Sequence, residues 1–225
     1  MRGICIMGMV CIHFLYDLGS VYDWEYPTAF TVLKQWGGIL FLLLSGVCVT
    51  LGSRHIRRGI TVLACGMLCS AVTAVLYLSG LAHRGVVIYF GILHCLGTCM
   101  LLWSFFSHFP AWGLCTVGVL LTVVGLHLNV HAQLPFPWLV PLGILYPGFA
   151  SADYFPLLPN LGFFLLGAFG GRTLYRNRQS RFPQINTNCL PLRFVCFCGR
   201  QSLLLYLLHQ PILMGVLWLI RHFCS

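Results

Sequence analysis

Residues 41–80 read FLLLSGVCVTLGSRHIRRGITVLACGMLCSAVTAVLYLSG. Two apolar runs flank one short basic turn, SRHIRRG, at residues 53–59. A helix needs about 20 mostly apolar residues to cross a hydrocarbon core of roughly 30 Å. The stretch therefore predicts two consecutive membrane helices joined by a short polar turn.

The same apolar pattern recurs along the whole chain. Of its 225 residues, 59% are hydrophobic and 8% are charged, against roughly 25% charged in a soluble domain. We therefore predict an all-α polytopic membrane bundle of about seven helices, forming one domain over residues 1–225. The expected membrane segments are residues 3–20, 30–52, 59–80, 85–107, 111–130, 155–171 and 199–220.

Two local patterns add detail to this bundle. The apolar segment 138–150 is too short to span and lies among prolines, so we expect it to be re-entrant or interfacial. Gly167 and Gly171 form a GxxxG pattern, which predicts a close contact with another helix. Most of the 12 cysteines lie in apolar runs, where we expect them to pack as small hydrophobic residues.

Charge orients the predicted helices. With the N-terminus in the cytoplasm, only Lys34, Arg84 and Arg221 lie at the outer side, and the other ten of the 13 basic residues lie inside. All four acidic residues then face outward: Asp17, Asp23, Glu25 and Asp153. The polar stretch 172–198 becomes a cytoplasmic loop, basic enough to contact anionic headgroups. The net charge of +9 is thus a topology signal and does not indicate nucleic acid binding.

Three histidines fall within the predicted membrane segments, where ionisable residues are costly and commonly functional. His13 lies about 16 Å beyond Arg2, near the middle of the core. His94 and His209 are each about nine residues into their predicted helices, at comparable depths. Asp17 follows His13 by one helical turn, so the carboxylate can orient the imidazole and raise its basicity, as a general base requires.

Two alternatives to a catalytic role remain open for these histidines. Each can be a hydrogen-bonding residue between helices, or the three can form a transition-metal site, although their spacing does not favour a metal. On the last helix Tyr206 and His209 share one stripe, followed directly by Gln210 and Pro211. This stripe, His94 and Asp153 are candidates to line a channel or an acceptor site.

The turn SRHIRRG carries the second candidate site. Arg54, Arg57 and Arg58 are spaced i, i+3, i+4, so in a helical turn they project from one side. Anchoring the topology needs only one or two arginines, and three guanidinium groups in this arrangement also suit phosphate binding. A phosphorylated donor arriving from the cytoplasm is consistent with this placement.

Several motifs together resemble a known family. Arg2 and His13, with ten residues between them, resemble the R-x10-H signature of transmembrane acyltransferases, and SRHIRR is similar to the RxxR motif of the acyltransferase-3 type. The closer resemblance is to the heparan-alpha-glucosaminide N-acetyltransferase catalytic-domain family in its short bacterial form. The segments that carry it, in the family's order, are RGICIMGMVCIHFLYDL, FLLLSGVCVTLGSRHIRRG, FGILHCLG, ADYFPLLPNLGFFLLG and GRQSLLLYLLHQP.

The resemblance implies transfer of an acetyl or acyl group from cytoplasmic acyl-CoA to an extracytoplasmic sugar amine or hydroxyl. It implies that His13 is catalytic with Asp17 as partner, and that Arg54 and Arg57 contact the donor phosphates; Arg58 is a further donor-binding candidate from its spacing. It also implies a bacterial inner-membrane protein that contacts lipid and a sugar-containing acceptor and can form a homo-oligomer. The spacing of the histidines leads us to expect no metal.

One departure from the family bears on mechanism. The lysosomal branch carries a histidine in its first lumenal loop, but the corresponding stretch VYDWEYPTAF has none. Either His13 does that work, or catalysis differs here. A transporter or channel for a small polar solute is the alternative function, because mid-membrane histidines and a proline-broken segment also suit a translocation path. A structural membrane subunit is a third.

Overall fold

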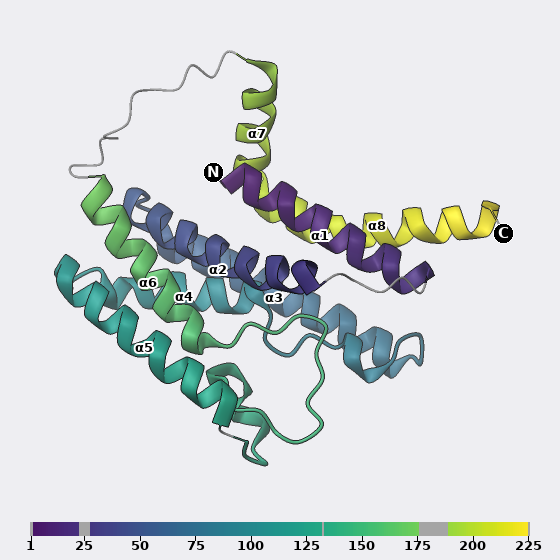
Figure 1. The fold of residues 1–225 in the computed structure, drawn as a ribbon, viewed down its shortest axis with the longest axis horizontal. Helices are drawn as coiled ribbons and strands as arrows, with labels where there is room; N and C mark the ends of the chain where they lie inside the picture. Colours follow the sequence, from purple (N-terminus) through teal and green to yellow (C-terminus); the bar gives the residue numbers. More distant parts are fainter. Residues whose placement is uncertain (1, 23–27, 132, 176–188, 225) are drawn as a thin grey trace. The chain divides into compact units, whose positions relative to one another are not determined.

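The computed structural model describes residues 2–22, 28–131, 133–175 and 189–224, and this part of the chain is all-helical, as predicted. Figure 1 shows its elements. They are α1 (Arg2–Tyr22), α2 (Thr28–Leu51), α3 (His55–Leu78), α4 (Ile92–Phe106), α5 (Ala111–His131), α6 (Leu157–Leu174), α7 (Leu190–Arg200) and α8 (Ser202–Cys224), with 3-10 turns η1 (Arg84–Val86) and η2 (Pro137–Leu142). Each predicted membrane segment overlaps one of the seven long helices.

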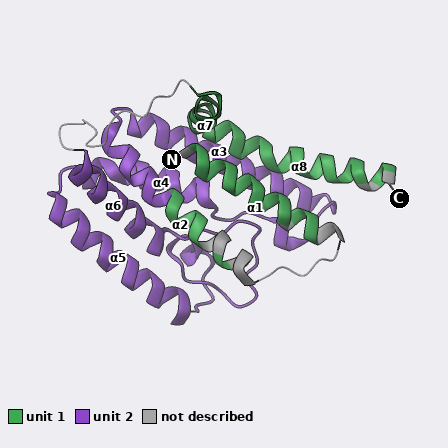
Figure 2. Ribbon diagram, turned by 45° about the horizontal axis from the view of Figure 1, so that its top comes forward, with its two compact units in different colours: residues 1–41, 182–225 green, residues 42–181 purple. Residues whose placement is uncertain are grey.

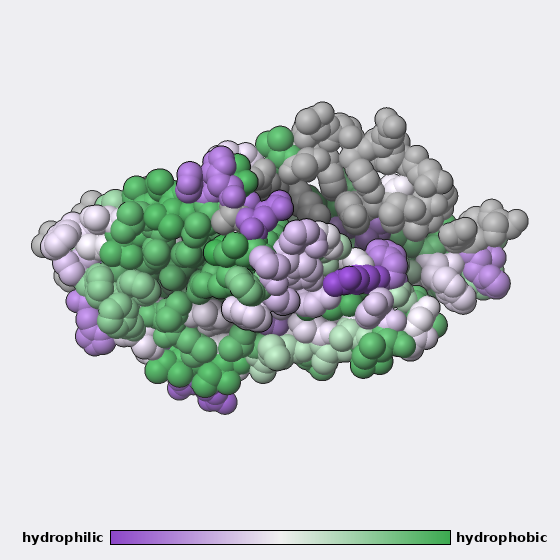
Figure 3. Space-filling view, turned by 90° about the horizontal axis from the view of Figure 1, so that it is seen from below, coloured by the Kyte–Doolittle hydropathy of each residue, from purple (hydrophilic) through white to green (hydrophobic). Residues whose placement is uncertain are grey.

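The helices carry apolar side chains outward. Among the described residues, three helices are long and apolar enough to cross a membrane: His55–Leu78, Ala111–His131 and Ser202–Ile220. On α5 alone Trp112 is 73% and Val130 is 74% exposed, and Figure 3 shows broad hydrophobic patches on one face. Apolar surface on this scale needs lipid to cover it. The protein is therefore a membrane protein, and the count of seven spans stays a prediction.

The chain divides into two compact units, coloured separately in Figure 2. Unit 1 comprises Met1–Phe41 and Phe182–Ser225, and unit 2 comprises Leu42–Arg181. In unit 1, α1 lies beside α8 and also packs against α7. The two ends of the chain thus form one unit. The expectation of a single domain over 1–225 remains a prediction.

Close helix contacts hold unit 2 together. In it α3 packs on α4, α5 packs on α6, and α4 also contacts α6. The second half of α2 approaches α6 so closely that a Cβ at Gly46 would overlap Phe164, and one at Gly167 would overlap Leu43. A Cβ at Gly171 would likewise meet Thr50. The close contact predicted from the GxxxG pattern is thereby confirmed.

Two predicted boundaries were wrong. The fourth helix begins at Ile92 and not at residue 85, because the η1 turn ends at Val86 and the chain is extended at Val87 and at Gly91. There Phe90 forms a parallel bridge with Tyr154, and the amide of Phe155 donates to the carbonyl of Phe90 at 2.9 Å. The second error is the predicted 172–198 loop: α6 continues to Leu174, and α7 occupies its end. Residues 176–188 of that loop lie outside the described residues.

The proline-rich segment 138–150 forms a folded loop. Its η2 turn holds Val140, which is 4% exposed and whose carbonyl accepts a hydrogen bond from the Tyr154 hydroxyl at 2.8 Å. The chain then doubles back, and the amide of Leu134 donates to the carbonyl of Leu145 at 3.0 Å. The loop thus anchors Val140 and two backbone carbonyls within the protein, while Trp138 and Leu142 are 70% and 41% exposed. Its re-entrant or interfacial location stays a prediction.

Arg172 of α6 contacts the turn that follows α4. Its guanidinium donates to the carbonyls of Ser107 and Phe109, just beyond the end of α4. The same group lies over the ring of Trp103, 5.2 Å from its centroid. A cation at this position satisfies the carbonyl of the C-cap residue Ser107 and interacts favourably with the negative end of the helix dipole.

Candidate active site

Two of the predicted histidines meet in unit 1. The rings of His13 on α1 and His209 on α8 lie edge to face, with centroids 4.9 Å apart. Figures 1 and 2 show the two helices side by side and running in the same direction. Residues separated by almost the whole sequence are therefore brought together.

The same helix pair joins Asp17 to Gln210. The side-chain amide of Gln210 donates to both carboxylate oxygens of Asp17, at 3.1 and 3.0 Å. Asp17 is 4% exposed. A buried carboxylate is costly unless it is hydrogen-bonded, and bonds to a charged acceptor are among the stronger ones. We call His13, Asp17, His209 and Gln210 the histidine–amide cluster.

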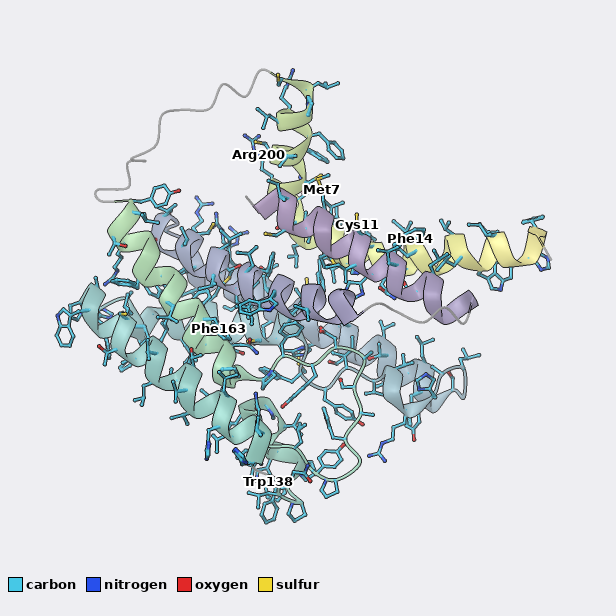
Figure 4. All side chains as sticks on the ribbon, viewed as in Figure 1. Met7, Cys11, Phe14, Trp138, Phe163 and Arg200 are labelled. Carbon is cyan, nitrogen blue, oxygen red and sulfur yellow. The ribbon has the colours of Figure 1, made fainter. Side chains whose placement is uncertain are left out.

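The two faces of α1 explain why the cluster forms. Met7, Cys11 and Phe14, labelled in Figure 4, recur at helical spacing and are exposed apolar side chains. Ile6 and Asp17 lie on another face and are 2% and 4% exposed. An apolar outer face covered by lipid and a polar face turned to a neighbouring helix is the arrangement expected for a membrane helix with buried polar residues.

His209 has one ring nitrogen engaged and one open. Its Nδ1 lies 2.6 Å from the carbonyl oxygen of Tyr206. A carbonyl only accepts, so Nδ1 carries a proton, and in the neutral ring Nε2 is then a lone-pair acceptor. His209 is 8% exposed, and its Nε2 has no hydrogen-bond partner among the described residues.

Gln210 repeats this pattern. Its amide nitrogen must face Asp17, because the amide oxygen there would meet a carboxylate. The oxygen Oε1 is then left buried and without a partner among the residues described. Buried polar atoms in proteins are almost always paired with protein, water or ligand. The cluster therefore presents two open acceptors on consecutive residues of α8.

Two further expectations concern this cluster. The hydrogen bond expected between His13 and Asp17 stays a prediction, and the carboxylate of Asp17 accepts hydrogen bonds from Gln210. Tyr206 lies near the cluster, with its ring 5.4 Å from that of His209. Its backbone carbonyl orients His209, a role that the side-chain stripe in the sequence did not indicate.

His94 in unit 2 is held differently. It lies in the first turn of α4, where its Nδ1 accepts from the Gly91 amide at 3.2 Å. Its Nε2 lies 3.3 Å from the hydroxyl of Ser70, which itself donates to the carbonyl of Ile88 at 2.6 Å. Both ring nitrogens are thus engaged, and Nε2 carries the proton that Ser70 accepts. This is the hydrogen-bonding role left open from the sequence.

The membrane depth predicted for His94 assumed a helix that starts at residue 85. Because α4 starts at Ile92, that predicted depth is wrong. The spacing of Gly91 and His94, as a cap and the third helical residue, could have indicated the actual role. Ser70 was missed entirely.

Asp153 also serves this helix start. Its Oδ2 accepts from the amide of Ile92 at 2.9 Å, so a carboxylate from a distant loop caps α4. A Cβ at Gly91 would overlap this carboxylate, which explains the glycine there. The channel-lining role predicted for His94 and Asp153 stays a prediction. Convergence of the three histidines on one cavity also stays a prediction. His13 and His209 belong to unit 1, whereas His94 belongs to unit 2.

The three arginines lie at the N-terminus of α3. Arg54 is its N-cap residue and makes no side-chain capping bond, while its carbonyl accepts from the Arg58 amide at 3.1 Å. All three side chains are exposed, and their guanidinium groups form no hydrogen bond with another described residue. The first amides of a helix carry partial positive charge. Exposed guanidinium groups beside them suit the binding of an anion, and the donor-binding role predicted for the three arginines stays a prediction.

The described residues contain no candidate metal site. Within residues 2–22, 28–131, 133–175 and 189–224, no three His, Cys, Asp or Glu side chains lie close enough to hold an ion.

These features define a helical membrane protein with a partly buried histidine–carboxylate–amide cluster and a basic helix terminus. The sequence model of the family described as heparan-alpha-glucosaminide N-acetyltransferase, catalytic, matches residues 1–211. The chain belongs to that family, which makes it a membrane protein of an acetyltransferase family. The match runs across both units. No curated protein and no solved structure gave a significant match.

Proposed function

We propose that this protein is a membrane acyltransferase that moves an acetyl or other acyl group from cytoplasmic acyl-CoA to an amine or hydroxyl of an extracytoplasmic carbohydrate. Membership of an acetyltransferase family supports the reaction class. The family match does not specify the donor, the acceptor or the direction of transfer, and these are what we propose.

The observation that carries it is the pair of open acceptors on α8. Nε2 of His209 and Oε1 of Gln210 are buried and unpaired among the described residues. Two hydrogen-bond acceptors are complementary to a group that brings N–H or O–H donors, such as a sugar amine or hydroxyl. A nearby imidazole can also take the proton that such a group loses when it attacks.

The proposed chemistry is direct acyl transfer. The amine or hydroxyl attacks the thioester carbonyl, a C–N or C–O bond forms, and the C–S bond breaks to release the CoA thiolate. The attacking group's proton passes to the base, His13 by the family resemblance, and then to the thiolate. Asp17 stabilises the imidazolium formed in between, as a carboxylate beside a histidine does in other acyl transfers.

Donor binding is proposed at the start of α3. The phosphates of CoA accept charge-assisted hydrogen bonds from Arg54, Arg57 and Arg58 and lie at the positive end of the helix. Exposure of all three side chains supports this, because a guanidinium already committed to a protein partner would be a poor ligand.

The test is transfer from radiolabelled acetyl-CoA by the purified protein in lipid nanodiscs, with glucosamine and its disaccharides as acceptors. Labelled acetylated sugar is the expected product. Binding of acetyl-CoA without any acetylated product from amine or hydroxyl sugars would contradict the proposal. Solute uptake into proteoliposomes without acetyl-CoA would instead favour the transporter alternative.

The orientation belongs to the proposal and has its own test. We expect a reporter fused within Arg176–Arg181 to be cytoplasmic and one after Ser225 to be extracytoplasmic, because seven spans place these points on opposite sides. A cytoplasmic reporter after Ser225 would mean that the segment 138–150 adds a span and that seven is wrong.

A further inference from the structure

The helix α7 is amphipathic, although its two arginines make its sequence look polar. One face packs inside unit 1, where Val195 meets Gly3 of α1 and Cys198 is 4% exposed. The packed face accounts for only part of the helix surface. The rest is open and carries both large apolar side chains and arginines.

The open surface has an apolar stripe and a basic edge. Leu190, Phe194 and Phe197 recur at i, i+4 and i+7 and are 80%, 56% and 56% exposed. Arg193 and Arg200, seven residues apart, form a second row next to this stripe, and both are exposed. The helix contains no acidic residue. Exposed phenylalanines beside arginines are typical of helices that lie in the membrane interface.

The direction of α7 supports the same conclusion. At 11 residues it is about 16 Å long, too short to cross a core of roughly 30 Å. It leads directly into α8, which contains the candidate span Ser202–Ile220. Figures 1 and 2 show α7 turned steeply away from the axis of α8. If α8 crosses the membrane, a helix set steeply against it at its start lies close to the membrane plane.

We propose that α7 is an interfacial helix on the cytoplasmic leaflet, with Leu190, Phe194 and Phe197 among the acyl chains and Arg193 and Arg200 on anionic lipid headgroups. The apolar stripe accounts for insertion, and the basic row selects the lipid. A cation row without any acid to neutralise it is complementary to phosphatidylglycerol or cardiolipin and not to a zwitterionic lipid.

Insertion is tested by fluorescence quenching with lipids brominated on their acyl chains. The variants Phe197→Trp and Cys196→Trp each add one tryptophan to an exposed position of α7, on the apolar stripe and away from it respectively. The emission added by Phe197→Trp should be quenched at least about twofold more than that added by Cys196→Trp. Equal quenching of the two would overturn the insertion of this face.

Headgroup selectivity is tested by thermal unfolding in micelles with and without phosphatidylglycerol. The wild-type unfolding temperature should rise with the anionic lipid. The Arg193→Gln/Arg200→Gln variant should lose most of that rise, and Arg84→Gln, which alters an exposed cation elsewhere, should keep it. An unchanged rise in the double variant would overturn the lipid assignment. Neither readout depends on acyl transfer.

Discussion

The histidine–amide cluster of unit 1 and the His94 site of unit 2 use similar residues to different ends. In unit 2 both ring nitrogens of His94 are engaged and the neighbouring carboxylate of Asp153 caps a helix. In unit 1 the carboxylate is also satisfied, yet Nε2 of His209 and Oε1 of Gln210 have no partner among the residues described. A polar residue inside a membrane is thus not by itself a sign of catalysis, and the acceptors left open mark the better candidate.

From the comparison of the two histidine sites, we predict the largest effect on acyl transfer for replacement of His209. Replacing His209 by alanine should cut acyl transfer about 100-fold or more, because the open Nε2 is lost and His13 loses its neighbouring ring. The measurement is product formation at saturating acetyl-CoA. His222→Ala is the matched control, since His222 lies on the same helix and is exposed. Full activity of His209→Ala would remove the cluster from the mechanism.

At His94 the expected loss is in stability. His94→Ala removes one buried and one partly buried hydrogen bond, and it leaves the Gly91 amide and the Ser70 hydroxyl short of a partner. We expect the free energy of unfolding to fall by about 2–4 kcal/mol. Denaturant unfolding in detergent measures this, with His13→Ala as the comparison. The distinction between the two sites fails if His94→Ala unfolds like wild type but loses turnover as His209→Ala does.

Much of this architecture could be predicted from local patterns. The long helices follow from apolar runs, and His13, Asp17 and His209 are candidates from their spacing and depth in the first and last helices. The hydrogen bonds from Gln210 to Asp17, which join these two helices, were not predicted. The roles of Ser70 and Asp153 could not be predicted, because their partners lie 24 and 61 residues away and no local pattern relates them. The α7 helix was missed because two arginines in 11 residues lower its hydropathy, although its apolar residues keep helical spacing.

The smallest predicted effect concerns the arginines at the start of α3. Here the sign of the change in the free energy of unfolding is informative. Arg57 places a cation in the first turn of a helix, where the dipole disfavours it. Without donor, Arg57→Gln should therefore stabilise the protein by about 0.3–1 kcal/mol. Arg200→Gln removes a cation from the last turn of α7 and should have the opposite sign. Thermal unfolding of both variants in neutral detergent measures the difference. Destabilisation by Arg57→Gln would mean that this arginine serves the fold and not an anionic donor.

The central claim is that donor binding and proton transfer are separate tasks of separate residues. It is tested most directly by measuring acetyl-CoA affinity and turnover on Arg54→Ala and His13→Ala in parallel. Arg54→Ala should weaken acetyl-CoA binding by about 1.5–3 kcal/mol, the scale of a hydrogen bond to a charged group. His13→Ala should bind acetyl-CoA nearly as wild type does and turn over about 100-fold or more slowly. Equal loss of acetyl-CoA binding in both variants, or full activity of His13→Ala, would contradict the account.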